Sequence, residues 1–216
     1  MARAYSEPPA SPVPLRLSYD EWRAWYGSTD LNRGEWVDGE VIPFTPPLVS
    51  HAEIVDLLHF LIGLFVRQQR LGRVFSESIE LWLPQSQAAR LPDIVFISNQ
   101  NLKHLTSYRL EGYADLVVEV VSTGSVTRDR RQKFIEYQTA GIPEYWIVDP
   151  RPRTQTVTQY QLDENGAYQA MPVDEQGRLH SRALPGFWVD PAWFWRDELP
   201  DPYHLLQTVL AEQSRS

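Results

Sequence analysis

A strand–helix–strand pattern in the second half of the chain constrains the fold most strongly. Two apolar, strand-like runs, Ala114–Val121 and Glu144–Val148, flank a helical stretch at about Ser125–Ala140 that Gly141 closes. Two strands joined by a helix are typical of a parallel crossover packed on a buried sheet. We therefore expect a mixed sheet flanked by helices, in an α/β chain that leans to α+β.

Other patterns extend this core in both directions. The elements expected before it are a capped helix from Ser18 to about Tyr26, a β-hairpin over Glu35–Ile42, a helix from His51 to about Leu71 closed by Gly72, and strands over Arg73–Leu83 and Leu91–Ile97. After it, Thr154–Val189 alternates between apolar and polar residues and predicts an antiparallel extension. A final helix is expected over Pro200–Glu212.

Composition narrows the class of protein. Of 216 residues, 43% are hydrophobic and none is cysteine, so any metal must bind to oxygen or imidazole. Residues 1–14 are proline-rich and are expected to form a disordered arm, whereas residues 15–216 are expected to form a single domain. The apolar stretches are too short or too interrupted to span a bilayer, so we expect a cytoplasmic protein without a membrane partner.

The formal net charge of −8 argues against a chain that coats DNA non-specifically, because that requires excess lysine and arginine. A local basic patch can still hold a phosphate backbone. Four basic residues do fall together, at Arg128, Arg130, Arg131 and Lys133.

Two carboxylates stand in strands that should be buried. Asp93 is expected on the same strand face as Val95, and Glu119 on the same face as Val117. Paired carboxylates on apolar faces repel each other unless a cation lies between them, so a divalent ion bound through oxygen is expected. The alternative is that Asp93 caps a turn and Glu119 pairs with an arginine.

A lysine follows on the expected helix. Lys133 lies at the edge of a core-facing stripe, from which a long side chain can reach the end of the Glu119 strand. The alternative is a surface ion pair with Asp129, four residues earlier. The stripe itself is formed by Val126, Phe134, Tyr137 and Gly141.

Together these motifs resemble the Uma-two family of restriction-like endonucleases, within the PD-(D/E)xK superfamily. The resemblance covers roughly residues 18–160. It rests on Leu91-Pro92-Asp93, on Glu119-Val120-Val121-Ser122, on Asp129, Lys133 and Tyr137 followed by Gly141–Pro150, and on Glu35–Glu40 with Pro46-Pro47 and His51. Its most specific part is Glu144–Pro150.

The resemblance implies a site for Mg²⁺ or Mn²⁺ held by Asp93 and Glu119, with the Val120 carbonyl as a third ligand. The superfamily pattern places a lysine two residues after the glutamate, where this chain has Val121. The resemblance implies that Lys133, on the helix, takes that place.

Three further residues are candidates for the site. Glu35 and Glu53 could each supply an outer metal ligand, and His51 matches the N-terminal part of the resemblance. The alternatives are a solvent-facing hairpin residue for Glu35 and a capping or packing role for His51.

The expected activity is metal-dependent hydrolysis of phosphodiester bonds in DNA, with Asp93, Glu119 and Lys133 as the catalytic residues. Arg128, Arg130 and Arg131 would contact the DNA backbone. A homodimer is expected, because two sites related by a two-fold axis cut both strands of a duplex most simply. The alternatives are a catalytically silent nuclease-fold module that binds nucleic acid or protein, and a metal-independent glycosidase that uses a carboxylate pair.

Overall fold

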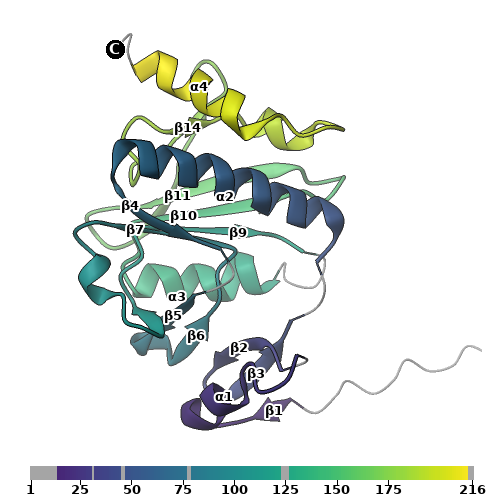
Figure 1. The fold of residues 1–216 in the computed structure, drawn as a ribbon, viewed down its shortest axis with the longest axis vertical. Coiled ribbons are helices and arrows are strands. Elements are labelled where there is room, and N and C mark those ends of the chain that lie inside the picture. The colour runs from purple at the N-terminus through teal and green to yellow at the C-terminus, as the bar shows by residue number, and fades with distance from the viewer. Residues whose placement is uncertain (1–13, 31, 45–46, 77–78, 123–126, 214–216) are drawn as a thin grey trace, which may run out of the picture.

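The computed structural model describes residues 14–30, 32–44, 47–76, 79–122 and 127–213. Two six-stranded sheets organise the chain (Figure 1). The central sheet has the order β12 (Tyr168–Ala170), β11 (Thr156–Leu162), β10 (Glu144–Asp149), β9 (Leu116–Val120), β7 (Ile94–Ser98) and β4 (Gly72–Phe75). The N-terminal sheet has the order β1 (Leu15–Arg16), β3 (Glu40–Pro43), β2 (Gly34–Val37), β6 (Ala88–Arg90), β5 (Glu80–Leu83) and β8 (Arg109–Glu111).

Helices cover both faces of the central sheet. Figure 1 shows α2 (Val49–Gln69) across one face with α4 (Pro202–Gln213) beyond it, and α3 (Phe134–Thr139) on the opposite face. The remaining elements are α1 (Tyr19–Trp25), the π-helical turn η3 (Arg128–Lys133), the short helices η1 (Pro84–Ser86), η2 (Leu102–His104) and η4 (Pro191–Trp195), and the strand pair β13 (Leu179–His180) and β14 (Trp188–Val189). This is the mixed α/β arrangement that the sequence predicts.

The central crossover is confirmed. β9 and β10 pair in parallel, with Val118 opposite Trp146, and η3 with α3 connects them. β11 and β12 then extend the sheet antiparallel, as the alternation of the C-terminal third predicts. Residues 123–126, which include the expected helix start at Ser125, lie outside the described part of the chain.

Local signals near the N-terminus are also confirmed. Ser18 caps α1 in a capping box with Glu21. The β2–β3 hairpin turns through Asp38 and Gly39, both with positive φ (45° and 83°), as a tight hairpin turn requires. The arm expected at residues 1–14 lies outside the described residues except for Pro14.

Two expected boundaries are wrong. Helix α2 ends at Gln69 and is capped by Arg70, which adopts the left-handed conformation (φ 55°), whereas Gly72 begins β4. Glycine is required there because a Cβ atom would lie 2.0 Å from the Ile97 carbonyl oxygen. The run expected as one strand over Arg73–Leu83 is two strands, β4 in the central sheet and β5 in the N-terminal sheet.

The central sheet separates two hydrophobic clusters. One lies on the side of α2 and α4 and contains Val118 and Val120 of β9. The other contains Val117 of the same strand and Val121 just after it, together with Tyr137 of α3. Because successive strand residues face opposite sides, Glu119 points into the second cluster.

Helix α2 is long and apolar enough to cross a membrane by length and composition alone, although the sequence stretch within it was expected to be too short. Half of the most apolar 18-residue stretch of α2 is buried inside the protein. Leu58, Leu61 and Phe65 of α2 have no exposed surface, so α2 is a central element of this fold.

Candidate active site

The two carboxylates expected at the site lie at neighbouring strand positions. β7 runs antiparallel to β9 with Ile94 opposite Val118, so continuing this register places Asp93 opposite Glu119. Asp93 itself precedes β7 rather than lying within it, because Pro92 has no N–H for the ladder. The Val120 amide donates a hydrogen bond of 2.6 Å to Asp93 Oδ2 and fixes that carboxylate at the C-terminal end of β9.

Lys133 is central to the buried face of its helix, not at its edge. The buried residues of the helix are Asp129, Lys133 and Tyr137, a regular spacing of four residues. An α-helix would rotate this series away from the sheet, but the π-helical turn η3 holds more residues per turn and keeps the three side chains aligned. Phe134 is only half-buried, and Val126 lies outside the described residues.

The Lys133 ammonium lies among three carboxylates. Its Nζ is 2.8 Å from Glu119 Oε1, 3.2 Å from Glu35 Oε1 and 3.5 Å from Asp129 Oδ1. The Lys133 side chain is only 6% exposed. The alternative of a surface pair with Asp129 is therefore wrong, because the contact exists but is buried and shared.

Glu35 reaches the same cluster from the N-terminal sheet. It is buried in β2 and accepts hydrogen bonds from the Leu91 amide (3.2 Å) and from Arg90 Nη1 (2.8 Å). The alternative of a solvent-facing hairpin residue is wrong. Because Glu35 contacts Lys133, this carboxylate belongs to the inner part of the cluster, where the sequence suggested an outer role.

Arg90 is a residue that the sequence analysis missed. Its guanidinium has no exposed surface and also holds Glu136 of α3 through two hydrogen bonds of 2.7 Å. It thereby connects β6, β2 and α3. The signal was present in the sequence, because Arg90 ends the apolar run Ala88-Ala89 just as Asp93 and Glu119 interrupt theirs.

Two tyrosines support the carboxylates from α3 and β10. The Tyr137 hydroxyl donates to Glu119 Oε1 at 2.8 Å, and the Tyr145 hydroxyl donates to the Asp129 carbonyl oxygen at 2.9 Å. Their rings pack edge to face with centroids 5.0 Å apart. The π-helical turn and the β9 carboxylate are thus held by one packed pair of side chains.

The pKa values of the two buried glutamates shift in opposite directions. Burial raises the pKa of Glu119, Lys133 lowers it, and Asp93, Asp129 and Glu35 raise it further, to about 8. Burial also raises the pKa of Glu35, but Lys133, Arg90 and Arg128 outweigh this and lower it to about 2. Burial opposes the charge on Lys133, yet Glu119, Glu35 and Asp129 raise its pKa, so the ammonium remains protonated.

The remaining candidates divide between the cluster and the surface. His51, in the first turn of α2, has its Nε2 atom 3.3 Å from Asp93 Oδ2 and is 8% exposed. Glu53 is exposed on the same helix and does not join the buried cluster. The outer-ligand role that the sequence suggested for Glu53 therefore has no support from a contact among the described residues and stays a prediction.

The three arginines of η3 are not equivalent. Arg128 lies 3.9 Å from Glu35 and is partly buried, and Arg130 pairs with Asp149 at 3.0 Å. Arg131 is exposed. Two of the three expected backbone contacts are therefore already engaged by carboxylates of the protein.

The donor set fits a hard divalent cation. Among the described residues, no three aspartate, glutamate, histidine or cysteine side chains gather closely enough to hold a metal by themselves. Mg²⁺ needs fewer, because it usually keeps several waters and binds one or two carboxylates. When Glu119 is ionised, the cluster has five carboxylates and three permanent cations, an excess of two negative charges that one divalent ion would balance. The carboxylates are Glu35, Asp93, Glu119, Asp129 and Glu136, and the cations are Arg90, Arg128 and Lys133.

Residues 19–192 match the family described as "Uma2: Putative restriction endonuclease". The chain belongs to the Uma2 family. An uncharacterised protein of Synechocystis is 26% identical to this chain over 118 residues. The matched region covers 54% of this chain and 66% of that protein, just under two thirds of its length. This Uma2 chain also shares its fold with a crystal structure from Anabaena variabilis titled a "putative nuclease belonging to DUF820", with a TM-score of 0.64 and 18% identity over 85% of this chain and 98% of the other.

Proposed function

We propose that this Uma2 protein is a metal-dependent endonuclease that hydrolyses phosphodiester bonds in DNA. The observation that carries the proposal is the contact between Lys133 Nζ and Glu119 Oε1 at 2.8 Å, beside a second carboxylate, Asp93, just before the neighbouring strand β7. A carboxylate pair can hold a metal ion, and an adjacent lysine can stabilise charge on a phosphate, so these groups can serve a metal-dependent phosphodiester hydrolase. Membership of a family of restriction-endonuclease-like nucleases supports this choice over a glycosidase.

Asp93 and Glu119 would hold Mg²⁺ or Mn²⁺, together with the Val120 carbonyl. The Val120 amide already bonds Asp93, and the carbonyl of an extended residue leaves the strand on the same side as its amide. When bound, the ion would lower the pKa of a water molecule and take up negative charge from the phosphate. His51 would orient Asp93 through the contact of its Nε2 atom with that carboxylate.

Lys133 acts as a cation and not as a base, because its carboxylate neighbours keep it protonated. Its ammonium would stabilise negative charge on a phosphate oxygen and hold the attacking water in line. It also favours the ionised form of Glu119, which is the form that binds metal. Glu35 and Asp129 fix the position of Nζ from two other sides.

The helix-borne lysine accounts for the departure at Val121. That side chain is 1% exposed and packs in the cluster with Tyr137, so a lysine there would have to enter the core. Lys133 reaches Glu119 from the helix instead. The catalytically silent module remains the second candidate because it needs only the metal ligands, and the acidic net charge of −8 favours it.

Contacts to the DNA backbone would come first from Arg131, which is exposed. Arg128 and Arg130 would contribute only by sharing their charge with Glu35 and Asp149. A contact of this kind neutralises phosphate and carries no sequence information. We therefore expect Arg131→Ala to weaken DNA binding and lower its salt dependence without changing the cleavage sites.

The test is cleavage of single-stranded, linear duplex and supercoiled DNA with Mg²⁺ or Mn²⁺, with EDTA as the metal-free control. Asp93→Asn is nearly isosteric and should lower the rate at least about 100-fold, since it removes one anionic ligand. Glu53→Gln is the matched control, because it removes a carboxylate of the same chain that is exposed. It should cut at the wild-type rate.

Two outcomes would contradict the proposal. If Asp93→Asn cuts DNA as fast as the wild type, the assigned site is wrong. If the wild-type protein binds Mn²⁺ through Asp93 and Glu119 but cuts no form of DNA, the silent module replaces the enzyme.

A further inference from the structure

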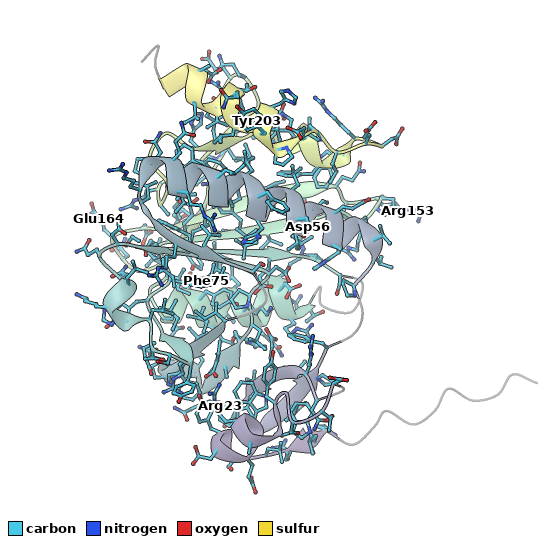
Figure 2. All side chains as sticks on the ribbon, in the orientation of Figure 1. Arg23, Asp56, Phe75, Arg153, Glu164 and Tyr203 are labelled. Carbon is cyan, nitrogen blue, oxygen red and sulfur yellow. The ribbon has the colours of Figure 1, made fainter. Side chains whose placement is uncertain are left out.

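One exposed side of α2 is polar at both ends and apolar in the middle. Asp56, Phe60, Gly63 and Arg67 follow one another at intervals of four, three and four residues, so they share one face of the helix. We call these four residues, with Glu53 before them and Arg70 after them, the α2 strip. Phe60 is 57% exposed, and Asp56 projects from the helix in Figure 2.

The α2 strip is complementary to itself when reversed. If a second copy of the helix lies antiparallel, with the two-fold axis between Leu61 and Ile62, Asp56 of each copy faces Arg67 of the other. Glu53 then faces Arg70 in the same way, and Phe60 faces Gly63. Both acidic residues lie in the first half of the strip and both basic residues at its end, so every charged position meets the opposite sign.

No close contact within the described part of the chain requires a glycine at position 63. A glycine in a helix interior is unfavourable by about 1 kcal/mol relative to alanine. A Cβ atom built on Gly63 has no atom within 4 Å, so no neighbouring element of the described chain excludes a side chain. A large side chain that approaches from outside, such as the Phe60 ring of a second copy, does require that space.

A groove beside the strip can take that ring. It has a volume of about 460 Å³ and lies between α2 and β4, lined by Phe60, Gly63 and Leu64 on one side and by Val74 and Phe75 on the other. β4 is the last strand in the order of the central sheet. An uncovered edge strand is prone to pair with other chains, and a second copy seated on the groove would cover it.

We propose that this chain forms a two-fold dimer through the α2 strip. At 1.5 Å per residue the strip is about 26 Å long, enough for four flanking ion pairs around an apolar centre. The inference rests on surface residues outside the buried cluster and is independent of the proposed nuclease activity.

Charge reversal tests the pairing. Light scattering of the wild-type chain at about 100 µM should give about twice the 25.0 kDa mass of one chain. Asp56→Arg and Arg67→Asp should each weaken the dimer at least about 10-fold, because each places like charges opposite one another. An equimolar mixture of the two variants should dimerise again, since one carries only basic and the other only acidic residues at these two positions.

Gly63→Leu is the second variant. It should fold, because its side chain enters open space, yet give the mass of one chain. Circular dichroism of each variant checks the fold. A wild-type chain that stays monomeric at about 100 µM would overturn the proposal, as would a dimer that survives both reversals or a mixture that stays monomeric.

Discussion

Replacing Glu119 by glutamine tests the electrostatics of the site without any substrate. Glutamine has the shape of the protonated glutamate and can still accept from the Tyr137 hydroxyl and the Lys133 ammonium through its Oε1 atom. What it removes is a negative charge buried beside Asp93, Asp129 and Glu35. In metal-free protein we expect this variant to be more stable than the wild type above neutral pH.

The magnitude follows from the pKa of Glu119, which the fold raises from 4.5 to about 8. Because the folded state binds this proton more tightly, the stability it contributes is full below about pH 4.5 and is lost as the pH rises through about 8. At about 1.4 kcal/mol for each tenfold change in proton affinity, the whole effect is about 5 kcal/mol. Between about pH 5.5 and pH 8.5 the advantage of the variant over the wild type should grow by about 3 kcal/mol.

Urea denaturation of both proteins in EDTA, at several pH values across that range, measures the difference directly. Every other titrating group is common to the two proteins, so the comparison isolates Glu119. Added Mg²⁺ should restore the wild type at the higher pH and leave the variant nearly unchanged, since a bound ion stabilises only the protein that holds it. A stability difference that does not vary with pH would refute the reasoning.

Three further predictions concern the same cluster. Lys133→Met should abolish cleavage and lower the free energy of unfolding by about 3–5 kcal/mol at about pH 8 in EDTA, because buried carboxylates lose their cation; urea denaturation with a wild-type stability would contradict this. The affinity for Mn²⁺ in calorimetry should rise by up to about tenfold per pH unit between about pH 6 and pH 8 and then level off, as Glu119 ionises; equal affinity at both ends would count against Glu119 as a ligand. Arg90→Lys should lower the melting temperature, because lysine cannot bridge Glu35 and Glu136 at once, and an unchanged melting curve would show that the bridge is unimportant.

The sequence predicted the core of the fold because its signals are local. The strand–helix–strand pattern around α3 depends on periodicity within each element, and so does the capping box at Ser18. The same reasoning found Asp93 and Glu119, since a carboxylate in an apolar strand is visible without knowing the partner strand. Their opposition across β7 and β9 then follows from the register.

What the sequence could not show depends on contacts between distant elements. In the sequence Glu35 looks like an ordinary hairpin residue, because only the folded N-terminal sheet brings it to Lys133. The role of Arg90 is likewise visible only in the fold, where Glu136 lies beside it. Lys133 was expected at the edge of its helix because the helical wheel assumes a regular α-helix. A π-helical turn changes the angle between successive side chains around the helix axis, and no simple residue pattern predicts such a turn.

The contacts of Arg90 with Glu35 and Glu136 determine when the buried cluster can form during synthesis of the chain. Arg90 contacts Glu35, 55 positions before it, and Glu136, 46 positions after it, so the cluster cannot form until the chain through α3 has left the ribosome. Contacts this distant in sequence form late and cost loop closure before they contribute any stability. A shorter nascent chain would hold scattered, hydrated carboxylates in place of this buried cluster. Under the proposed function, hydrolytic activity would therefore appear only after the chain through α3 has been made, which delays the first possible cut.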